Sequence, residues 1–201
     1  LLPIPNSDVV AISWTTVFVI IAALSPLVSS LTAFFFAFFA LLKKYLTFCD
    51  KQVLGVSRVP KPEDLGYDEL SIDIMNKSKS FIHLAGKAHD LKRTSEAKHY
   101  FEVNTELTKS LFNQFLISDC EVFIYMSSVK AVADVVDGVL TEDVISNPVT
   151  VYGKSKLAAE IYILSKTIPD NKRVYILRPC MIHGPNNKGN LKEIRYFSPV
   201  F

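Results

Sequence analysis

Four short, mostly apolar runs recur along the chain after residue 52. They are Val53 to Ser57, Phe81 to Ala85, Val122 to Met126 and Val174 to Arg178. Strands that are buried on both faces of a parallel sheet have this continuous apolar character instead of a strict alternation. The pattern therefore predicts four parallel strands.

The longer stretches between these runs have apolar residues at helical spacing. One extends from about Ser95 to Leu116, and another from Tyr152 to about Lys166. Apolar positions that recur every three or four residues indicate amphipathic helices. Strands that alternate with helices predict an α/β fold built on a parallel sheet.

The first 42 residues have a different character. Positions 9–42 contain no charged residue and have Pro26 near their middle, whereas charges are frequent from Lys43 onward. About 20 helical residues span the hydrocarbon layer, so the run predicts a helical membrane span or a hairpin bent at Pro26. Lys43 and Lys44 would then lie on the cytoplasmic side, with the rest of the chain. The alternative is a buried or aberrant part of a globular domain.

We therefore divide the chain into an apolar segment, 1–42, and a domain, 43–201. The localisation expected is membrane-associated with a cytoplasmic domain, or cytoplasmic. The 22 basic and 20 acidic residues leave a formal charge of +2, which argues against nucleic-acid binding. Cys49, Cys120 and Cys180 are widely separated, so neither a metal site nor a disulfide framework is predicted. His83, inside an apolar run, is expected to be a core residue.

A tyrosine and a lysine lie four residues apart at the start of the second helix. Tyr152 and Lys156 therefore share a helix face, and Tyr152 follows Ser128, at the end of a predicted strand, by 24 residues. A phenol with a pKa near 10 needs about 4 kcal/mol of stabilisation to act as a base at pH 7. An ammonium about 4 Å away supplies energy of that order. Tyr162 and Lys166 repeat the spacing without the context, so we interpret Tyr162 as a packing residue.

Five consecutive blocks of the sequence carry a family resemblance: FIHLAGKAHD, YFEVNTELT, FIYMSSVKAV, TEDVISNPVTVYGKSKLAAE and RVYILRPCMIHGP. In their order and spacing they resemble the NAD-dependent epimerase/dehydratase family, the extended short-chain dehydrogenases/reductases related to UDP-glucose 4-epimerase. The resemblance implies a Rossmann-like, doubly wound parallel sheet, here incomplete, that follows an apolar and helical N-terminal segment. It also implies a nucleotide-sugar substrate and NAD or NADP as cofactor, and it is compatible with a homodimer.

The resemblance also implies roles for individual residues. Ser128, Tyr152 and Lys156 match the catalytic serine, tyrosine and lysine of the family, and Lys156 would also hold the nicotinamide ribose. The positions that match cofactor-lining residues are Leu84, Ala85, Gly86, Lys87, Asn104 and Cys180. For Asn104 the alternative is a solvated helix residue. Arg58 stands where the family usually has an acidic residue, and an arginine there tolerates the 2′-phosphate of NADP.

The glycine loop of the dinucleotide fold is missing. No glycine precedes Gly55, and the three expected loop positions fall near Ala33, Phe36 and Phe39. Phenylalanine would fill the phosphate site and does not readily take the positive φ values that glycine allows. We therefore predict weak NAD(P) binding and impaired activity. The alternatives are a membrane-anchored scaffold without catalysis and a truncated or frame-altered inactive product.

Overall fold

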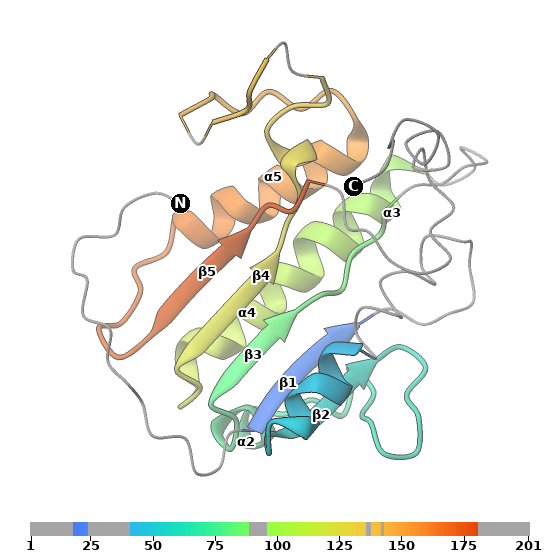
Figure 1. Ribbon diagram of the computed structural model, residues 1–201, viewed down its shortest axis with the longest axis vertical. Coiled ribbons are helices and arrows are strands. Elements are labelled where there is room, and N and C mark those ends of the chain that lie inside the picture. Colours follow the sequence, from blue (N-terminus) through green and yellow to red (C-terminus); the bar gives the residue numbers. More distant parts are fainter. Residues whose placement is uncertain (1–17, 24–40, 89–95, 136–137, 142, 181–201) are drawn as a thin grey trace, which may run out of the picture.

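A parallel five-stranded sheet forms the centre of the computed structural model (Figure 1). The strand order is β2-β1-β3-β4-β5, and every neighbouring pair is parallel. The structure describes residues 18–23, for backbone only, and residues 41–88, 96–135, 138–141 and 143–180. The strands are β1 (Phe18–Ala23), β2 (Gln52–Ser57), β3 (Ser80–His83), β4 (Val122–Met126) and β5 (Arg173–Leu177).

The position of β1 corrects the expectation that the apolar N-terminal run is helical. Phe18–Ala23 form a strand, which pairs with β2 on one side and β3 on the other. A central parallel strand and a membrane helix both require uncharged apolar residues, so composition alone does not separate them. Within the described parts of the chain, no helix is both long enough and apolar enough to span a membrane. The predicted boundary at residue 42 stays a prediction, and Ala33, Phe36 and Phe39 lie outside the described residues.

The four predicted strands are confirmed as β2 to β5, with ends that differ from the predicted ends by at most two residues. The predicted helix from Ser95 to Leu116 is α3 (Ala97–Phe101), a π-helical turn (Glu102–Glu106) and α4 (Leu107–Ile117) in succession. The predicted helix that begins at Tyr152 is α5 (Val151–Leu164). A short helix, α2 (Ile72–Asn76), precedes β3.

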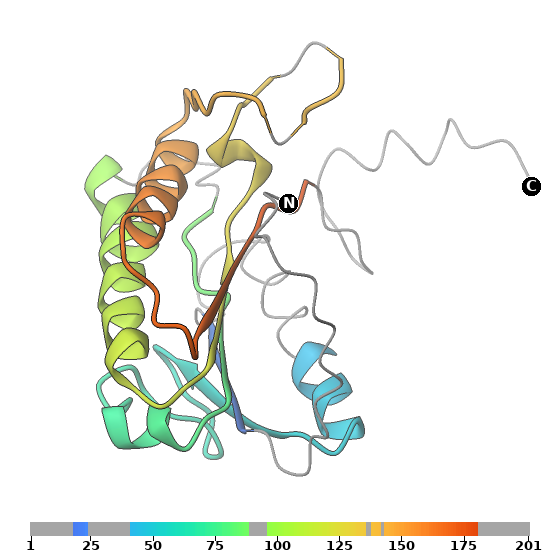
Figure 2. The same cartoon turned by 90° about the vertical axis from the view of Figure 1, so that its left-hand side faces the viewer.

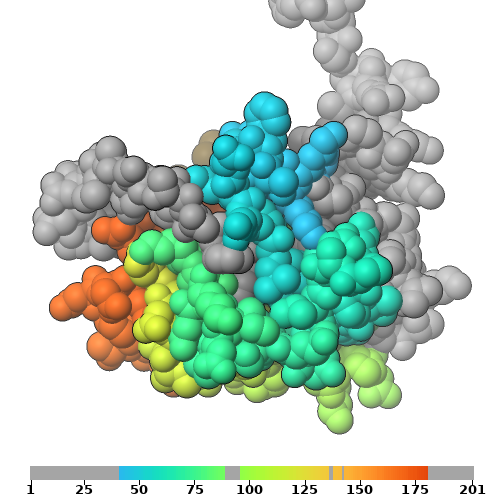
Figure 3. Space-filling view, turned by 90° about the horizontal axis from the view of Figure 1, so that it is seen from below, coloured from blue at the N-terminus to red at the C-terminus, as the bar shows by residue number. Residues whose placement is uncertain are grey.

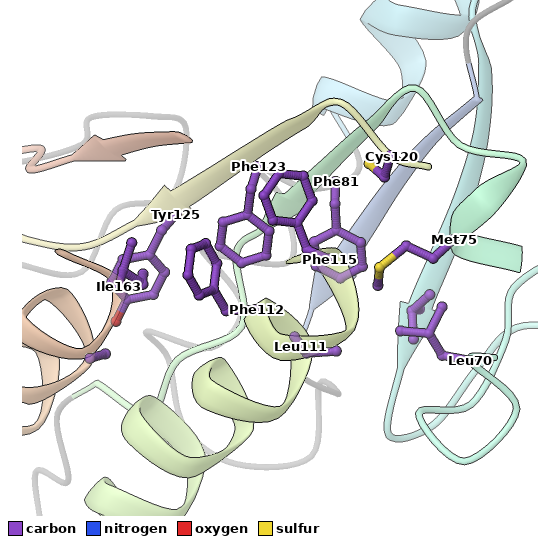
Figure 4. Close-up of a cluster of buried hydrophobic side chains, with 12 residues drawn as sticks. Leu70, Met75, Phe81, Leu111, Phe112, Phe115, Cys120, Phe123, Tyr125 and Ile163 are labelled. Carbon is purple, nitrogen blue, oxygen red and sulfur yellow. The ribbon is translucent and has the colours of Figure 1, made fainter. Parts of the chain in front are cut away.

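Helices α4 and α5 cover one face of the sheet, and residues 41–48, which are helical, lie on the other face (Figure 2). The larger core lies under α4 and α5, where aromatic rings from β3 and β4 meet those of α4 (Figure 4). Phe123 is central to it, because its ring contacts those of Phe81, Phe112 and Phe115. The packing of this core sets the distance between the sheet and helices α4 and α5.

All strands run in the same direction, so their carboxyl ends meet at one edge of the sheet (Figure 1). The opposite edge, where the strands begin, is seen in Figure 3. There the orange, yellow and green segments that lead into β5, β4 and β3 lie side by side in that order. In open α/β sheets, ligands bind outside the carboxyl ends of the strands. That edge is therefore the place to look for a site.

Candidate active site at the carboxyl ends of the strands

Ser128 and Tyr152 meet at the carboxyl end of β4. Ser128 is buried two residues beyond the strand and accepts a hydrogen bond from the amide of Lys130 (3.2 Å), which caps a 3-10 turn, Val129–Ala131. Tyr152 lies in the first turn of α5, and its side chain forms a hydrogen bond with that of Ser128. Burial raises the pKa of Tyr152 and the Ser128 hydrogen bond lowers it; burial has the larger effect, so the pKa lies above its ordinary value.

The first turn of α5 is fixed to the segment after Ser128 by Asp134. Its carboxylate accepts hydrogen bonds from the amides of Val149 (2.7 Å) and Thr150 (2.9 Å) and from the Thr150 hydroxyl (2.9 Å). The Thr150 hydroxyl in turn caps α5 by accepting from the amide of Gly153 (3.1 Å). These bonds determine where α5 begins, and with it the position of Tyr152.

Gly153 lets α5 come close to the turn after Ser128. A Cβ atom at this position would lie 2.2 Å from the carbonyl oxygen of Lys130 and 2.8 Å from the Cβ of Pro148. No real Cβ approaches backbone oxygen so closely, so any larger residue would push the helix away. The glycine between Tyr152 and Lys154 is thus a packing requirement of the Ser128–Tyr152 contact.

Lys156 lies one turn further along α5 and is almost completely buried, with 2% of its surface exposed. Its Nζ donates to the carbonyl oxygen of Met126 (2.8 Å) and lies 4.8 Å from the centre of the Tyr125 ring. Burial lowers the pKa of Lys156 to about 7, and the charge of Glu160 opposes this shift. We expected the ammonium to lower the pKa of Tyr152; in the structure Ser128 lowers it, and Lys156 is directed at the Met126 carbonyl.

The predicted cofactor-lining segment runs from the end of β3 past Lys156. Leu84 and Ala85 are buried, and a Cβ atom at Gly86 would lie 2.9 Å from the Nζ of Lys156. Lys87 places its ammonium over the Tyr100 ring, 5.4 Å from the ring centre. The absence of a side chain at Gly86 lets the ammonium of Lys156 come close to the backbone there.

Asn104 joins that segment to α5. Its Oδ1 accepts from the amide of Lys87 (2.6 Å), while its Nδ2 donates to the carbonyl of Lys87 (2.9 Å) and to the hydroxyl of Ser155 (2.8 Å). Asn104 is fully buried, so the alternative of a solvated helix residue is wrong. It lies in the π-helical turn, a local widening that the sequence periodicity did not reveal.

Cys180 and Arg58 occupy opposite sides of the carboxyl edge. Residues 177–179 run beside the end of β4, because the amides of Ser127 and Val129 donate to the carbonyls of Leu177 (2.7 Å) and Pro179 (3.2 Å). Cys180 follows this segment and is exposed. Arg58 is exposed at the end of β2, which β1 and β3 separate from β4. The structure therefore does not bring Arg58 to the Ser128–Tyr152 pair.

Two further predictions are confirmed. His83 is a core residue, fully buried with Nε2 at 2.8 Å from the Thr108 hydroxyl, and burial lowers its pKa to about 3, with a further contribution from the charge of Lys156. Tyr162 packs against the larger core and donates its hydroxyl to Asn113 (2.8 Å). Neither His83 nor Tyr162 has the role predicted for Tyr152.

A buried acidic residue near the site was missed. Glu160 follows Lys156 by four residues, accepts from the hydroxyl of Ser127 and forms an ion pair with Arg178 (2.5 Å). The signal was present in the sequence, because a glutamate four positions after the lysine shares its helix face. For Asp134 no local pattern offered a comparable signal.

A hollow of about 440 Å³ lies elsewhere, next to helical residues 41–48 and the loop after β2. It is lined by Lys43, Lys44, Thr47, Phe48, Lys61, Glu63 and Asp64. None of the predicted site residues lines it.

Known proteins resemble this chain in sequence. A family model described as NAD dependent epimerase/dehydratase family matches residues 64–198. A UDP-glucose 4-epimerase from Vibrio cholerae is 33% identical over 121 residues, which are 56% of this chain and 36% of that protein.

Solved structures share the fold. MoeE5 in complex with UDP-glucuronic acid and NAD has a TM-score of 0.64 at 21% identity, over 88% of this chain and 59% of that one. The human epimerase family protein SDR39U1 with NADPH has a TM-score of 0.67 at 18% identity, over 89% and 58%. The chain thus spans between about a third and three fifths of the length of these proteins.

Proposed function

The chain belongs to the NAD dependent epimerase/dehydratase family, and we propose that it oxidises a hydroxyl group of a nucleotide sugar, with Tyr152 as the base. One observation carries the proposal: a half-buried tyrosine hydrogen-bonded to a buried serine, one helical turn from a buried lysine, at the carboxyl end of a parallel sheet. The UDP-sugars named for the related proteins support a UDP-sugar as substrate.

The residues at this edge fit the nicotinamide end of NAD or NADP. Gly86 lets the ammonium of Lys156 lie against the backbone, so that a bound ribose would contact both. Arg58, at the end of β2, is at the edge where the adenosine ribose would lie. The cofactors named for the solved relatives, NAD and NADPH, support either form.

NAD or NADP, held beside Lys156 and Gly86, would supply the hydride acceptor for the sugar carbon in the proposed reaction. Ser128 hydrogen-bonds the sugar hydroxyl, and Tyr152 takes its proton while the carbon loses the hydride. Lys156 holds the ribose and contributes positive charge. Because the pKa of Tyr152 lies above its ordinary value in the structure, the phenolate needs stabilisation beyond that from Ser128. Binding of the cofactor therefore has to make the electrostatic potential around Tyr152 more positive.

The test is conversion of UDP-glucose by the full chain at millimolar NAD, followed by chromatography of the sugar nucleotides. We expect turnover, and Y152F should reduce it about a thousandfold, because removal of a general base costs 10²–10⁴. Y162F is the matched control, since Tyr162 has the same lysine spacing but hydrogen-bonds Asn113. Equal activity of Y152F and the unmodified chain would overturn the role of Tyr152.

Cofactor affinity is measured separately, by isothermal titration with NAD and NADP. No glycine lies between β1 and Gly55, and because glycines in the loop after the first strand let the backbone approach the pyrophosphate, we expect millimolar dissociation constants. A micromolar constant would contradict our interpretation of the missing glycine loop.

A further inference from the structure

Glu160 ties three elements together at the reactive edge. It is fully buried on α5, and its carboxylate accepts the hydroxyl of Ser127, which directly follows β4. Arg178, directly after β5, donates its Nε to both carboxylate oxygens (3.1 Å each) and a terminal nitrogen to Oε2 (2.5 Å). Glu160 thus joins the ends of β4 and β5 to α5, which lies next to both strands (Figure 1).

This ion pair implies an ionised carboxylate. A buried carboxylate without partners would take up a proton, whereas one that accepts from an arginine and a hydroxyl keeps its charge. The hydrogen bond to Glu160 correspondingly raises the pKa of Arg178. A negative charge is therefore fixed one helical turn beyond Lys156.

We propose that Glu160 is a positioning residue of the active site: it holds the chain beyond β4 and β5 against α5 and favours the charged form of the buried Lys156. The role in catalysis rests on the proposed function, but the effect on Lys156 does not. A structural clamp alone would need only the Arg178 and Ser127 contacts. The shared helix face of Lys156 and Glu160 adds an electrostatic effect.

Several charged or titratable groups besides Glu160 surround Lys156. Tyr152 precedes it on α5, Tyr125 faces its ammonium from β4, and His83 approaches from β3. Arg178, next to β5, is the ion-pair partner of Glu160. Burial keeps His83 neutral and both tyrosines protonated near pH 7, so Glu160 is the charge that acts on Lys156.

The experiment follows the titration of Lys156 in the full chain by NMR of lysine labelled with ¹³C at the ε position, without cofactor or substrate. The resonance is assigned by its absence in K156M. We expect E160Q to move the midpoint to lower pH by about one unit, a tenfold change in proton affinity. We expect R178K, which keeps a cation beside Glu160 but loses the paired hydrogen bonds, to leave the midpoint nearly unchanged.

A shift in E160Q without one in R178K supports the proposal, because a purely structural loosening of the pair would affect both variants. An unchanged midpoint in E160Q, or equal shifts in E160Q and R178K, would overturn it. If E160Q does not fold, the double variant E160Q/R178Q, which leaves no buried charge unpaired, is measured instead, and an unchanged midpoint there would overturn the proposal. S127A is the control: it removes one hydrogen bond to Glu160 but no charge, and should leave the midpoint nearly unchanged. Since no turnover is measured, the result stands apart from the test of Tyr152.

Discussion

The two sides of the sheet use buried charge differently. Beside β4 and β5, the buried Lys156 and Glu160 and the half-buried Arg178 lie around the end of the strands. Beside β2, Asp64 forms an ion pair with Lys43 (2.5 Å) above Gly55, and thereby attaches helical residues 41–48 to the loop after that strand. The first arrangement places charge next to a tyrosine and a serine, whereas the second holds backbone segments together.

This difference separates the proposed catalytic groups from Arg58, the residue proposed for the adenosine end of the cofactor. The proposed catalytic groups come from elements that follow β3, where hydrogen bonds hold every neighbouring segment. The β2 side supplies Arg58 for the far end of the cofactor, and the sequence before it has no glycine. The geometry around Tyr152 can therefore be intact even if the affinity for NAD(P) is low, and the two properties should respond to different substitutions.

The largest expected difference between the two sides comes from adding one methyl group to each. G153A brings a Cβ to 2.2 Å from the backbone oxygen of Lys130, which cannot move away without displacing the turn after Ser128. We expect a loss of about 3 kcal/mol of unfolding free energy, despite the higher helix propensity of alanine. Urea denaturation followed by circular dichroism measures this loss.

G55A is the matched substitution on the β2 side. Its Cβ would lie 2.3 Å from the Oδ1 of Asp64, a side chain that can rotate away if its bond to Lys43 breaks. We expect a cost of about 1 kcal/mol, because only a partly exposed ion pair is lost. A larger loss in G55A than in G153A would reverse our comparison of the two sides.

A smaller effect than that of G153A is expected from substitution of Arg58. It tests whether the β2 side selects between NAD and NADP. R58A should weaken NADP binding about tenfold relative to NAD, because an arginine at this place binds a 2′-phosphate. The ratio of the two dissociation constants, measured by titration calorimetry, isolates this effect from the overall affinity.

K61A is the control for Arg58, since Lys61 is an exposed cation three residues further along the same loop. If R58A and K61A change the ratio equally, the selection of NADP comes from general charge and not from Arg58. If R58A weakens the binding of NAD and of NADP to the same extent, Arg58 does not face the 2′-position of the adenosine ribose.

The parts of the fold that follow β2 could be predicted from the sequence because local pattern and tertiary position agree there. The apolar runs at β4 and β5 are found within one residue. β1 could not be distinguished from a membrane helix, because Phe18–Ala23 lie in a longer uncharged run and only the pairing with β2 and β3 reveals the strand.

The candidate site was predictable only where the motif is local. Tyr152 and Lys156 are one helical turn apart, so their spacing is visible in the sequence. The contact of Asp134 with Thr150 closes a loop of 16 positions, and that of Glu160 with Arg178 joins a helix to a strand end. Such contacts depend on how helices and strands pack against one another. The periodicity of apolar residues carries no information about that packing.

The smallest effect that we predict concerns Asp134 and the start of α5. Burial raises the pKa of Asp134, but the hydrogen bonds from Thr150 and Val149 outweigh it, so the pKa lies below its ordinary value. A lowered pKa in the folded state stabilises the protein above the pKa of the unfolded state. That stabilisation disappears as the pH falls through the folded-state value. Because Asp134 is partly exposed, D134N should cost only about 1 kcal/mol at pH 7.

Urea denaturation of D134N and the unmodified chain at pH 7 and at successively lower pH measures this contribution. The difference between the two should be largest at pH 7 and vanish below the folded-state pKa of Asp134, where both side chains are neutral. D143N serves as the control, because Asp143 is an exposed carboxylate in the same loop. A difference that is independent of pH would mean that Asp134 acts through shape alone, and the start of α5 would then not depend on its charge.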